Sequence, residues 1–199
     1  MIIDFLRREH RNIEKLLSVL ENELEVFDQG EKPDYEVIGA VIAYFEVYLE
    51  IYHHPQEDAI FQRLKSLNPA AAEIVGDLAE EHRSGAERLR RVSQAITSVL
   101  ADRIMPRQIV DGIIRDFILH ERRHIDMEER DFFPAAIKAL QPQDWAEITS
   151  TSTEQKRDPL FSEVVEQRFD VVRQHILQLE QQAEEQRAES AQRNSHVSR

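Results

Sequence analysis

The clearest helical pattern in this chain is residues 106–140, PRQIVDGIIRDFILHERRHIDMEERDFFPAAIKAL. Apolar residues recur in it three or four positions apart, which is the spacing of the buried face of a helix, and no strand-like alternation interrupts them. Pro106 stands where a helix accepts proline, in its first turn. We expect one helix here, with these inward positions: Ile109, Ile113, Phe117, Met127, Phe132 or Phe133, and Ala136.

The same period continues in three segments on the N-terminal side of this helix. It predicts helices over about residues 2–27, 34–67 and 69–101, which are separated by a break at residues 28–33 and by the dipeptide Asn68-Pro69. Four long helices joined by short connections predict an all-α fold, an up-down-up-down four-helix bundle. We expect this bundle to occupy residues 1–140.

The remainder of the chain predicts an addition to the bundle. A less regular stretch, residues 141–159, precedes a fifth helical pattern that runs from about residue 161 into the 180s. We expect residues 141–180 to form a linker and a C-terminal helix packed on or near the bundle, and residues 181–199 to form a frayed or disordered polar tail. The apolar positions that such docking would bury are Trp145, Leu160, Phe161, Val165, Phe169, Val172 and Ile176.

The composition limits the chemistry and the partners of this chain. Its 199 residues contain no cysteine, so disulfides, thiolate nucleophiles and cysteine-type metal sites are excluded, and any metal must be held by histidine and carboxylate. The formal net charge of −13 disfavours nucleic acid and anionic membranes as partners. The sequence has neither an apolar run of about 18 residues nor a signal peptide, so we expect a cytoplasmic location.

Polar side chains occupy several inward positions of the four helices. His10 and His82 each stand in an apolar stripe, and His53 and His124 are each followed four residues later by a glutamate. Residues four apart stack on one helix face, so each pair presents an imidazole beside a carboxylate. At a rise of about 1.5 Å per residue, all four helices bring these groups to one level of the bundle. The set is His10, His53, Glu57, His82, His124 and Glu128.

This set of side chains predicts a metal site. Four imidazoles and two carboxylates would be costly to bury without a cation. They suit iron, manganese or zinc, and they are too many for one tetrahedral zinc that keeps an open position. They suit two metal ions bridged by the carboxylates, with positions left for a small molecule, and histidine-rich ligation of this kind favours iron that binds or activates dioxygen.

Four neighbouring side chains have more than one interpretation. His120 lies one turn before His124 and is either a further ligand or a histidine of the core. His54 and Asp58 lie one position beyond the ligand pair; they either bind metal, face solvent or another helix, or orient the ligands. Tyr48 is either a core aromatic residue or a phenol that hydrogen-bonds a ligand of the metal.

The spacing of these residues resembles that of the hemerythrin-like family, the HHE cation-binding domains. The family pattern is His, His-x-x-x-Glu, His and His-x-x-x-Glu on four successive helices. Here it reads EHRNIEKLL (9–17), HHPQEDAIFQRL (53–64), EEHRSGAERL (80–89) and HIDMEERDFFPAA (124–136), and the following LQPQDWAEI resembles longer bacterial members. The resemblance implies that the six residues above bind two iron ions joined by an oxo or hydroxo bridge, in preference to zinc or manganese, with Glu57 and Glu128 bridging.

One departure from the family pattern bears on function. Oxygen-carrying hemerythrins have a further histidine one turn before the third-helix ligand, and Leu78 stands there in this chain. The resemblance therefore implies a bacterial role: binding or sensing O2, NO or redox state, or handling iron. The alternative is a di-iron enzyme with peroxidase-like or NO-reducing activity. The expected partners are a diatomic ligand or peroxide, and a protein partner or a second copy bound through the C-terminal helix.

A rival di-iron arrangement would use other acidic residues. Ferritin-like proteins place a glutamate on each of two helices and Glu-x-x-His on the other two. The residues of this chain that match in type are Glu9, Glu50 with His53, Glu81, and Glu121 with His124. Because Glu9 and Glu81 lie off the apolar stripes of their helices, we expect the hemerythrin-like set to bind the metal.

Overall fold

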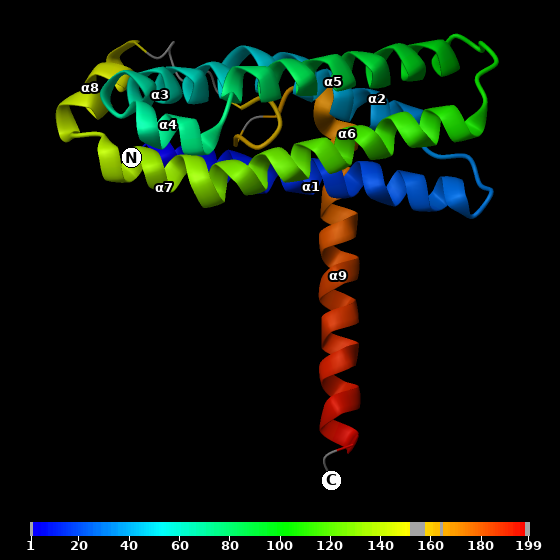
Figure 1. Ribbon diagram of the computed structural model, residues 1–199. Coiled ribbons are helices and arrows are strands. Elements are labelled where there is room, and N and C mark those ends of the chain that lie inside the picture. Colours follow the sequence, from blue (N-terminus) through cyan, green and yellow to red (C-terminus); the bar gives the residue numbers. More distant parts are fainter. Residues whose placement is uncertain (1, 152–157, 164, 198–199) are drawn as a thin grey trace.

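The computed structural model describes residues 2–151, 158–163 and 165–197, and these residues form an all-α structure (Figure 1). Its bundle consists of four rods. The first rod is α1 (Ile2–Asp28), and the second combines α2 (Tyr35–Tyr44), η1 (Phe45–His53) and α3 (His54–Leu67). The third is α5 (Leu78–Leu100), and the fourth combines α6 (Arg107–Met127), η2 (Glu128–Phe132) and α7 (Phe133–Ala139). The predicted four-helix bundle with an additional C-terminal helix is confirmed.

Proline changes the helical geometry of the second and fourth rods at matching places. Pro55 and Pro134 have no backbone N–H to donate, and each follows a π-helical segment, η1 or η2. The backbone N–H of His54, for example, donates to the carbonyl of Leu49, five residues back. The turns beside the two histidine–glutamate pairs are therefore wider than α-helical turns.

Two details of the predicted helices are wrong. The third predicted segment consists of two helices. The first, α4 (Pro69–Val75), is followed by Gly76, which has a φ of 94°, a backbone conformation that glycine adopts without strain. α5 then begins after Asp77, whose carboxylate accepts the backbone N–H of Glu80. On α6, the side chain of Ile109 is 51% exposed. The buried positions of that helix are Val110, Ile114, Phe117, Ile118, Glu121 and His124, so the predicted position of Phe117 is confirmed, and Ile113 is half-buried.

Buried apolar side chains form two clusters, one on each side of a polar layer. The large cluster includes Ile13, Leu49, Leu89 and Phe117, and the small cluster includes Leu6, Ile60, Leu78 and Phe132. Along α1, His10 stands between Leu6 of the small cluster and Ile13 of the large one. The other rods pass from one cluster to the other in the same way, so the inward polar residues are enclosed between two apolar regions.

The C-terminal part of the chain packs on both clusters: Ile148 is buried in the small cluster, and the residues from Leu160 onward pack on the large cluster. α8 (Pro142–Thr151) follows the bundle, and residues 158–163 lead to η3 (Gln167–Phe169) and α9 (Asp170–Val197). The beginning of α9 contacts α1 and α2, and the helix then points away from the bundle (Figure 1). The side chains buried there are Leu160, Phe169, Val172 and Ile176.

Some predictions for this part of the chain differ from the structure. α9 begins at Asp170, later than the predicted residue 161. Phe161 and Val165 are half-buried against the large cluster, whereas Trp145 packs against the small cluster, away from α9. The domain boundaries at residues 140 and 180 and the frayed tail stay predictions, and residues 152–157 lie outside the described residues.

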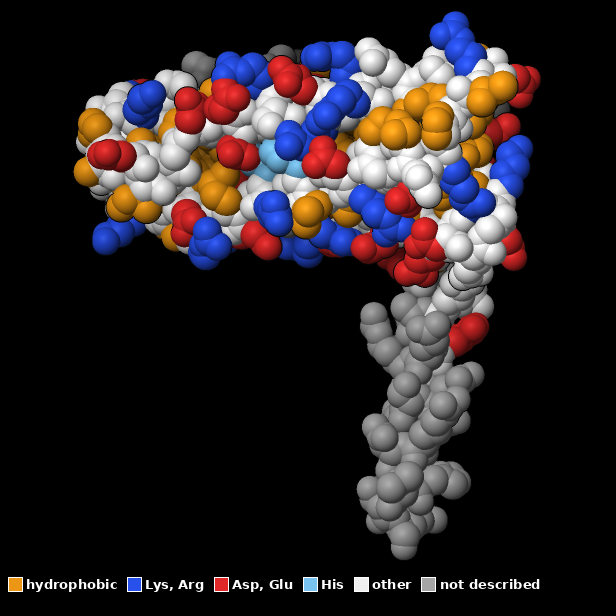
Figure 2. Space-filling view, turned by 45° about the vertical axis from the view of Figure 1, so that its right-hand side comes forward, with side chains coloured by type: hydrophobic (Ala, Val, Ile, Leu, Met, Phe, Trp, Pro, Cys, Tyr) orange, Lys and Arg blue, Asp and Glu red, His pale blue; other side chains and the backbone are white. Residues whose placement is uncertain are grey.

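The outer surface of the bundle carries mixed charges. Figure 2 shows Lys and Arg interspersed with Asp and Glu over one face, with histidine visible in one small area. Histidine is therefore largely covered by other side chains on this face. Within the part of the chain that the structure describes, no helix combines the length and apolar character needed to cross a membrane.

Candidate metal centre

The structure brings the six predicted ligands together in the polar layer. They come from all four rods: one from α1, two from the second rod, one from α5 and two from the fourth rod. Glu57 and Glu128 are completely buried, and the four histidines are 2–7% exposed. The six residues are His10, His53, Glu57, His82, His124 and Glu128.

One half of the layer, which we name the first metal position, consists of His10, His53 and one oxygen from each glutamate. Glu57 Oε1 lies 3.3 Å from His10 Nε2 and 3.3 Å from His53 Nε2. Glu128 Oε2 lies 3.3 Å from the same His10 nitrogen. Donor atoms of His10, His53 and Glu57 therefore all lie within 4.8 Å of one another, and Glu128 Oε2 adjoins this group through its contact with His10.

The other half, the second metal position, receives the remaining oxygen of each glutamate. His82 Nε2 lies 3.5 Å from Glu57 Oε2 and 3.6 Å from Glu128 Oε1. His124 Nε2 lies 3.2 Å from Glu128 Oε1. Each carboxylate thus faces histidines of both positions through different oxygens, as a bridging ligand must.

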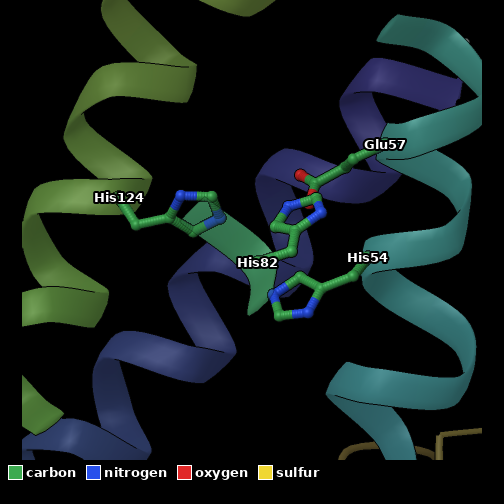
Figure 3. A group of neighbouring side chains, drawn as sticks. All are labelled: His54, Glu57, His82 and His124. Carbon is green, nitrogen blue, oxygen red and sulfur yellow. The ribbon is translucent and has the colours of Figure 1, made fainter. Parts of the chain in front are cut away.

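His54 also belongs to the second metal position. Donor atoms of His54, Glu57, His82 and His124 all lie within 4.8 Å of one another. Figure 3 shows His54 and Glu57 extending from α3 toward His82, with His124 on the opposite side. The imidazole ring of His54 stacks on that of His82, with 4.1 Å between the ring centroids.

The buried glutamates raise the pKa of two of the histidines that face them. Burial by itself lowers the pKa of His10, but the buried carboxylates of Glu128 and Glu57 outweigh it and raise the pKa to about 11. Burial also lowers the pKa of His53, and the charge of Glu57 outweighs it and raises the pKa to about 9. The buried carboxylates therefore attract protons onto the imidazoles, and a metal cation would replace those protons.

Several inward-facing atoms fit the donor set of a metal. Among the described residues, no hydrogen bond reaches Glu57 Oε2, either carboxylate oxygen of Glu128, or Nε2 of His82 and His124. Buried polar atoms are rarely left without a partner. Imidazole nitrogens and carboxylate oxygens are suitable ligands for iron, and two clustered sets of them fit two ions.

The outer nitrogens of three histidines face carboxylates. The pairs are His10 with Glu129 at 2.9 Å, His53 with Glu9 at 3.0 Å, and His82 with Asp58 at 3.0 Å. A proton on Nδ1 that is donated to a carboxylate leaves Nε2 free to bind metal and fixes the orientation of the ring. Asp58 thus lies where an orienting residue would. Sequence analysis named Glu9 only in the rival acidic set and did not assign it an orienting role, and it did not name Glu129, whose only signal was proximity to ligands.

The other sequence candidates have different surroundings. Tyr48 is buried and donates a hydrogen bond to Glu9. His120 is half-buried, and its ring centroid lies 6.3 Å from that of His124; it joins neither group of potential donor atoms. Leu78 is fully buried in the small cluster.

The rival acidic set is not assembled as a metal site. Glu81 is exposed, and among the described residues no group of potential donor atoms contains Glu9, Glu50 or Glu121. Glu9 and Glu121 are nevertheless 4% and 2% exposed. The expectation that Glu9 lies off the buried face is therefore wrong, although the conclusion about the metal set does not depend on it.

Comparison with known proteins identifies the family. The family model described as "Hemerythrin HHE cation binding domain" matches residues 1–136, which include all of the potential metal-binding residues described above. No curated protein and no solved structure matches the chain. Because the match covers more than half of the chain, this protein belongs to the hemerythrin family of HHE cation-binding domains.

Proposed function

We propose that this protein is a non-haem di-iron protein whose centre binds O2 or NO, or responds to redox state. The family gives cation binding. The observation that supports two ions is the arrangement of Glu57 and Glu128, because each carboxylate directs different oxygens toward the two metal positions. A single ion would leave one half of this buried donor set without a partner.

We further propose that His54 supplies the histidine whose usual place is taken by Leu78. With His54, the second metal position has three imidazoles, whereas the first has two. His120, the other candidate, is half-buried and outside the donor groups. The first metal position thus keeps fewer protein donors and is the better place for an exogenous ligand.

The surroundings of the centre suit a small apolar ligand. Iron held by histidine and carboxylate with a free position binds or activates small diatomic molecules. The two apolar clusters limit the access of water to the layer, and the ring of Phe133 stacks on His10 with 5.3 Å between the centroids. The carboxylates of Glu9 and Glu129 hold the outer nitrogens of His53 and His10, which favours preorganised rings over mobile ones.

The test is metal content together with the optical response to O2 and NO. After anaerobic loading with Fe(II), we expect about two iron ions per chain and a new absorption band on adding either gas that disappears when the gas is removed. His54→Ala should lower the iron content, and the matched variant His120→Ala should leave it unchanged. Zinc in place of iron, or no bound metal after loading, would refute the proposal. Irreversible oxidation with consumption of peroxide would favour the enzyme alternative.

A further inference from the structure

We propose that the C-terminal segment (residues 158–163 and 165–176) supports the first metal position through Tyr44, Tyr48 and Glu9. Metal binding and the docking of this segment would then strengthen each other. The inference rests on the two-metal centre proposed above. It concerns residues beyond the family match, which ends at residue 136.

The first contact in this connection is between His53 and Glu9. Its Nδ1 lies 3.0 Å from Glu9 Oε2, on the opposite side of the ring from the nitrogen that faces Glu57. Both His53 and Glu9 are almost fully buried, so water does not compete for this contact. A carboxylate in this place fixes the tautomer and orientation of a metal-binding imidazole, and makes it a better donor.

The second step is the contact between Tyr48 and Glu9. The hydroxyl of Tyr48 donates to Glu9 Oε1, so both oxygens of this carboxylate are engaged, one by the tyrosine and one by His53. Burial raises the pKa of Tyr48, and the charge of Glu9 raises it further. The phenol therefore keeps its proton and remains a donor that holds Glu9 in place.

The third step connects Tyr48 to the C-terminal segment. Tyr44 stacks on Tyr48 with 5.3 Å between the ring centroids, and its hydroxyl donates to Asp158 Oδ2 at 3.0 Å. The other oxygen of Asp158 accepts the backbone N–H groups of Leu160 and Phe161, each at 2.8 Å. One carboxylate thus shapes the turn of the segment and binds the tyrosine that packs against Tyr48.

Apolar packing places the segment over the same tyrosine. The rings of Phe161 and Phe169 meet Tyr44 edge to face, with centroid distances of 6.0 and 5.9 Å. Phe169 and Val172 are completely buried, and both belong to the large cluster with Tyr44 and Tyr48. If the segment left the bundle, the Tyr44 hydroxyl would lose its acceptor and the Tyr44–Tyr48 stack would lose its cover.

Thermodynamic linkage makes this connection reciprocal. If docking of the segment stabilises the His53–Glu9 contact and so favours bound metal, bound metal must favour docking by the same factor. Removing an outer-shell partner of a metal-binding histidine weakens metal affinity by about 10–100-fold. Because Tyr44 acts through Tyr48 and Glu9, we expect removal of its hydroxyl to weaken metal affinity by about 10-fold, the lower end of this range.

The experiment compares Tyr44→Phe with Tyr35→Phe in the full-length protein. Each variant removes one phenolic oxygen from α2, and Tyr35 has no part in the contacts above. Affinity for Fe(II) is measured by anaerobic competition with a chromophoric chelator, and hydrogen exchange by mass spectrometry follows residues 158–176 with and without iron. Tyr48→Phe serves as a second variant that interrupts the connection at another point, and circular dichroism checks folding.

We expect iron to slow hydrogen exchange in residues 158–176 of the unmodified protein. Tyr44→Phe and Tyr48→Phe should abolish this protection and weaken Fe(II) binding by about 10-fold, whereas Tyr35→Phe should behave as the unmodified protein. Exchange that does not respond to iron in the unmodified protein, or equal behaviour of all three variants, would overturn the inference while the two-metal centre stands. An unmodified protein that takes up no iron would overturn the proposed function and this inference together.

Discussion

Replacing Glu57 by glutamine should have a far larger effect than the same change at Glu121, although both side chains are buried in the same bundle. Glu57 faces His10 and His53 at 3.3 Å and His82 at 3.5 Å. Glu57→Gln keeps the volume of the side chain and removes its charge. Glu121 forms no ion pair with any residue that the structure describes, and burial and the charges of Glu50 and Glu128 disfavour its ionised form.

The expected difference in Tm follows from the buried ion pairs that Glu57 forms and that Glu121, among the described residues, does not. Removing one member of a buried ion pair costs about 3–5 kcal/mol, because the other member stays buried and unpaired. At about 2–4 °C per kcal/mol for a domain of this size, Glu57→Gln should lower the Tm of the metal-free protein by about 6–20 °C. At Glu121, burial raises the pKa to about 8, together with the charges of Glu50 and Glu128. Its carboxyl group is thus largely neutral at pH 7, and glutamine is a close substitute.

The assay is thermal unfolding of both variants after chelation, followed by iron content after reloading. Glu57→Gln should hold less iron than the unmodified protein, because Glu57 directs one oxygen to each metal position. Glu121→Gln should keep the full iron content and the original Tm or a higher one. Equal melting temperatures for the two variants, or full iron content in Glu57→Gln, would refute the reasoning.

Three further predictions concern the intact centre and its surroundings. Chelation should lower the Tm by about 10–20 °C, since each ion at 100 times its Kd adds about 2.7 kcal/mol to the free energy of unfolding. Differential scanning calorimetry checks this, and equal Tm values for the metal-free and loaded proteins would contradict a buried metal site. The metal-free protein should lose stability as pH rises from 7 to 10, because the folded pKa values of His10 and His53, about 11 and 9, exceed the unfolded value of 6.5. Their contribution is complete below about 6.5 and is lost progressively as the pH rises from there to the folded pKa values. Melting curves at several pH values should show a smaller change for the loaded protein. Phe133→Ala should cost about 3–5 kcal/mol in urea unfolding and weaken iron binding, because it removes the ring that stacks on His10; an unchanged iron affinity would show that the stacking does not support the centre.

The six expected ligands could be identified from sequence because regular spacing carries the information. Residues four apart share a helix face. Residues of two helices that lie the same number of positions from the connection between them are at the same level of the bundle. His54 could not be assigned in this way. It follows His53 directly, and in a regular α-helix two consecutive side chains point about 100° apart. The π-helical η1 and the following Pro55 alter this phase, and both histidines are buried.

Other differences have equally local causes. Glu9 is buried because Tyr48 and His53 supply partners for its carboxylate, and pattern analysis of α1 alone contains neither residue. The end of α4 at Gly76 could have been recognised, since glycine followed by a capping aspartate is a usual helix boundary. The contact of Asp158 with Tyr44 spans 114 residues, and no periodic pattern reports on such a pairing.

The two π-helical segments constrain how the length of this chain can vary during evolution. Loss of one residue from η1 or η2 would allow the rod to return to regular α-helical hydrogen bonding, and it would rotate every later side chain by about 100° relative to the earlier ones. The large and small clusters lie on opposite sides of the polar layer, so one of the two would lose its register with the other rods. Relatives should therefore differ in length within the connections between rods, such as residues 101–106, while the distance in sequence from Leu49 to Ile60 is kept.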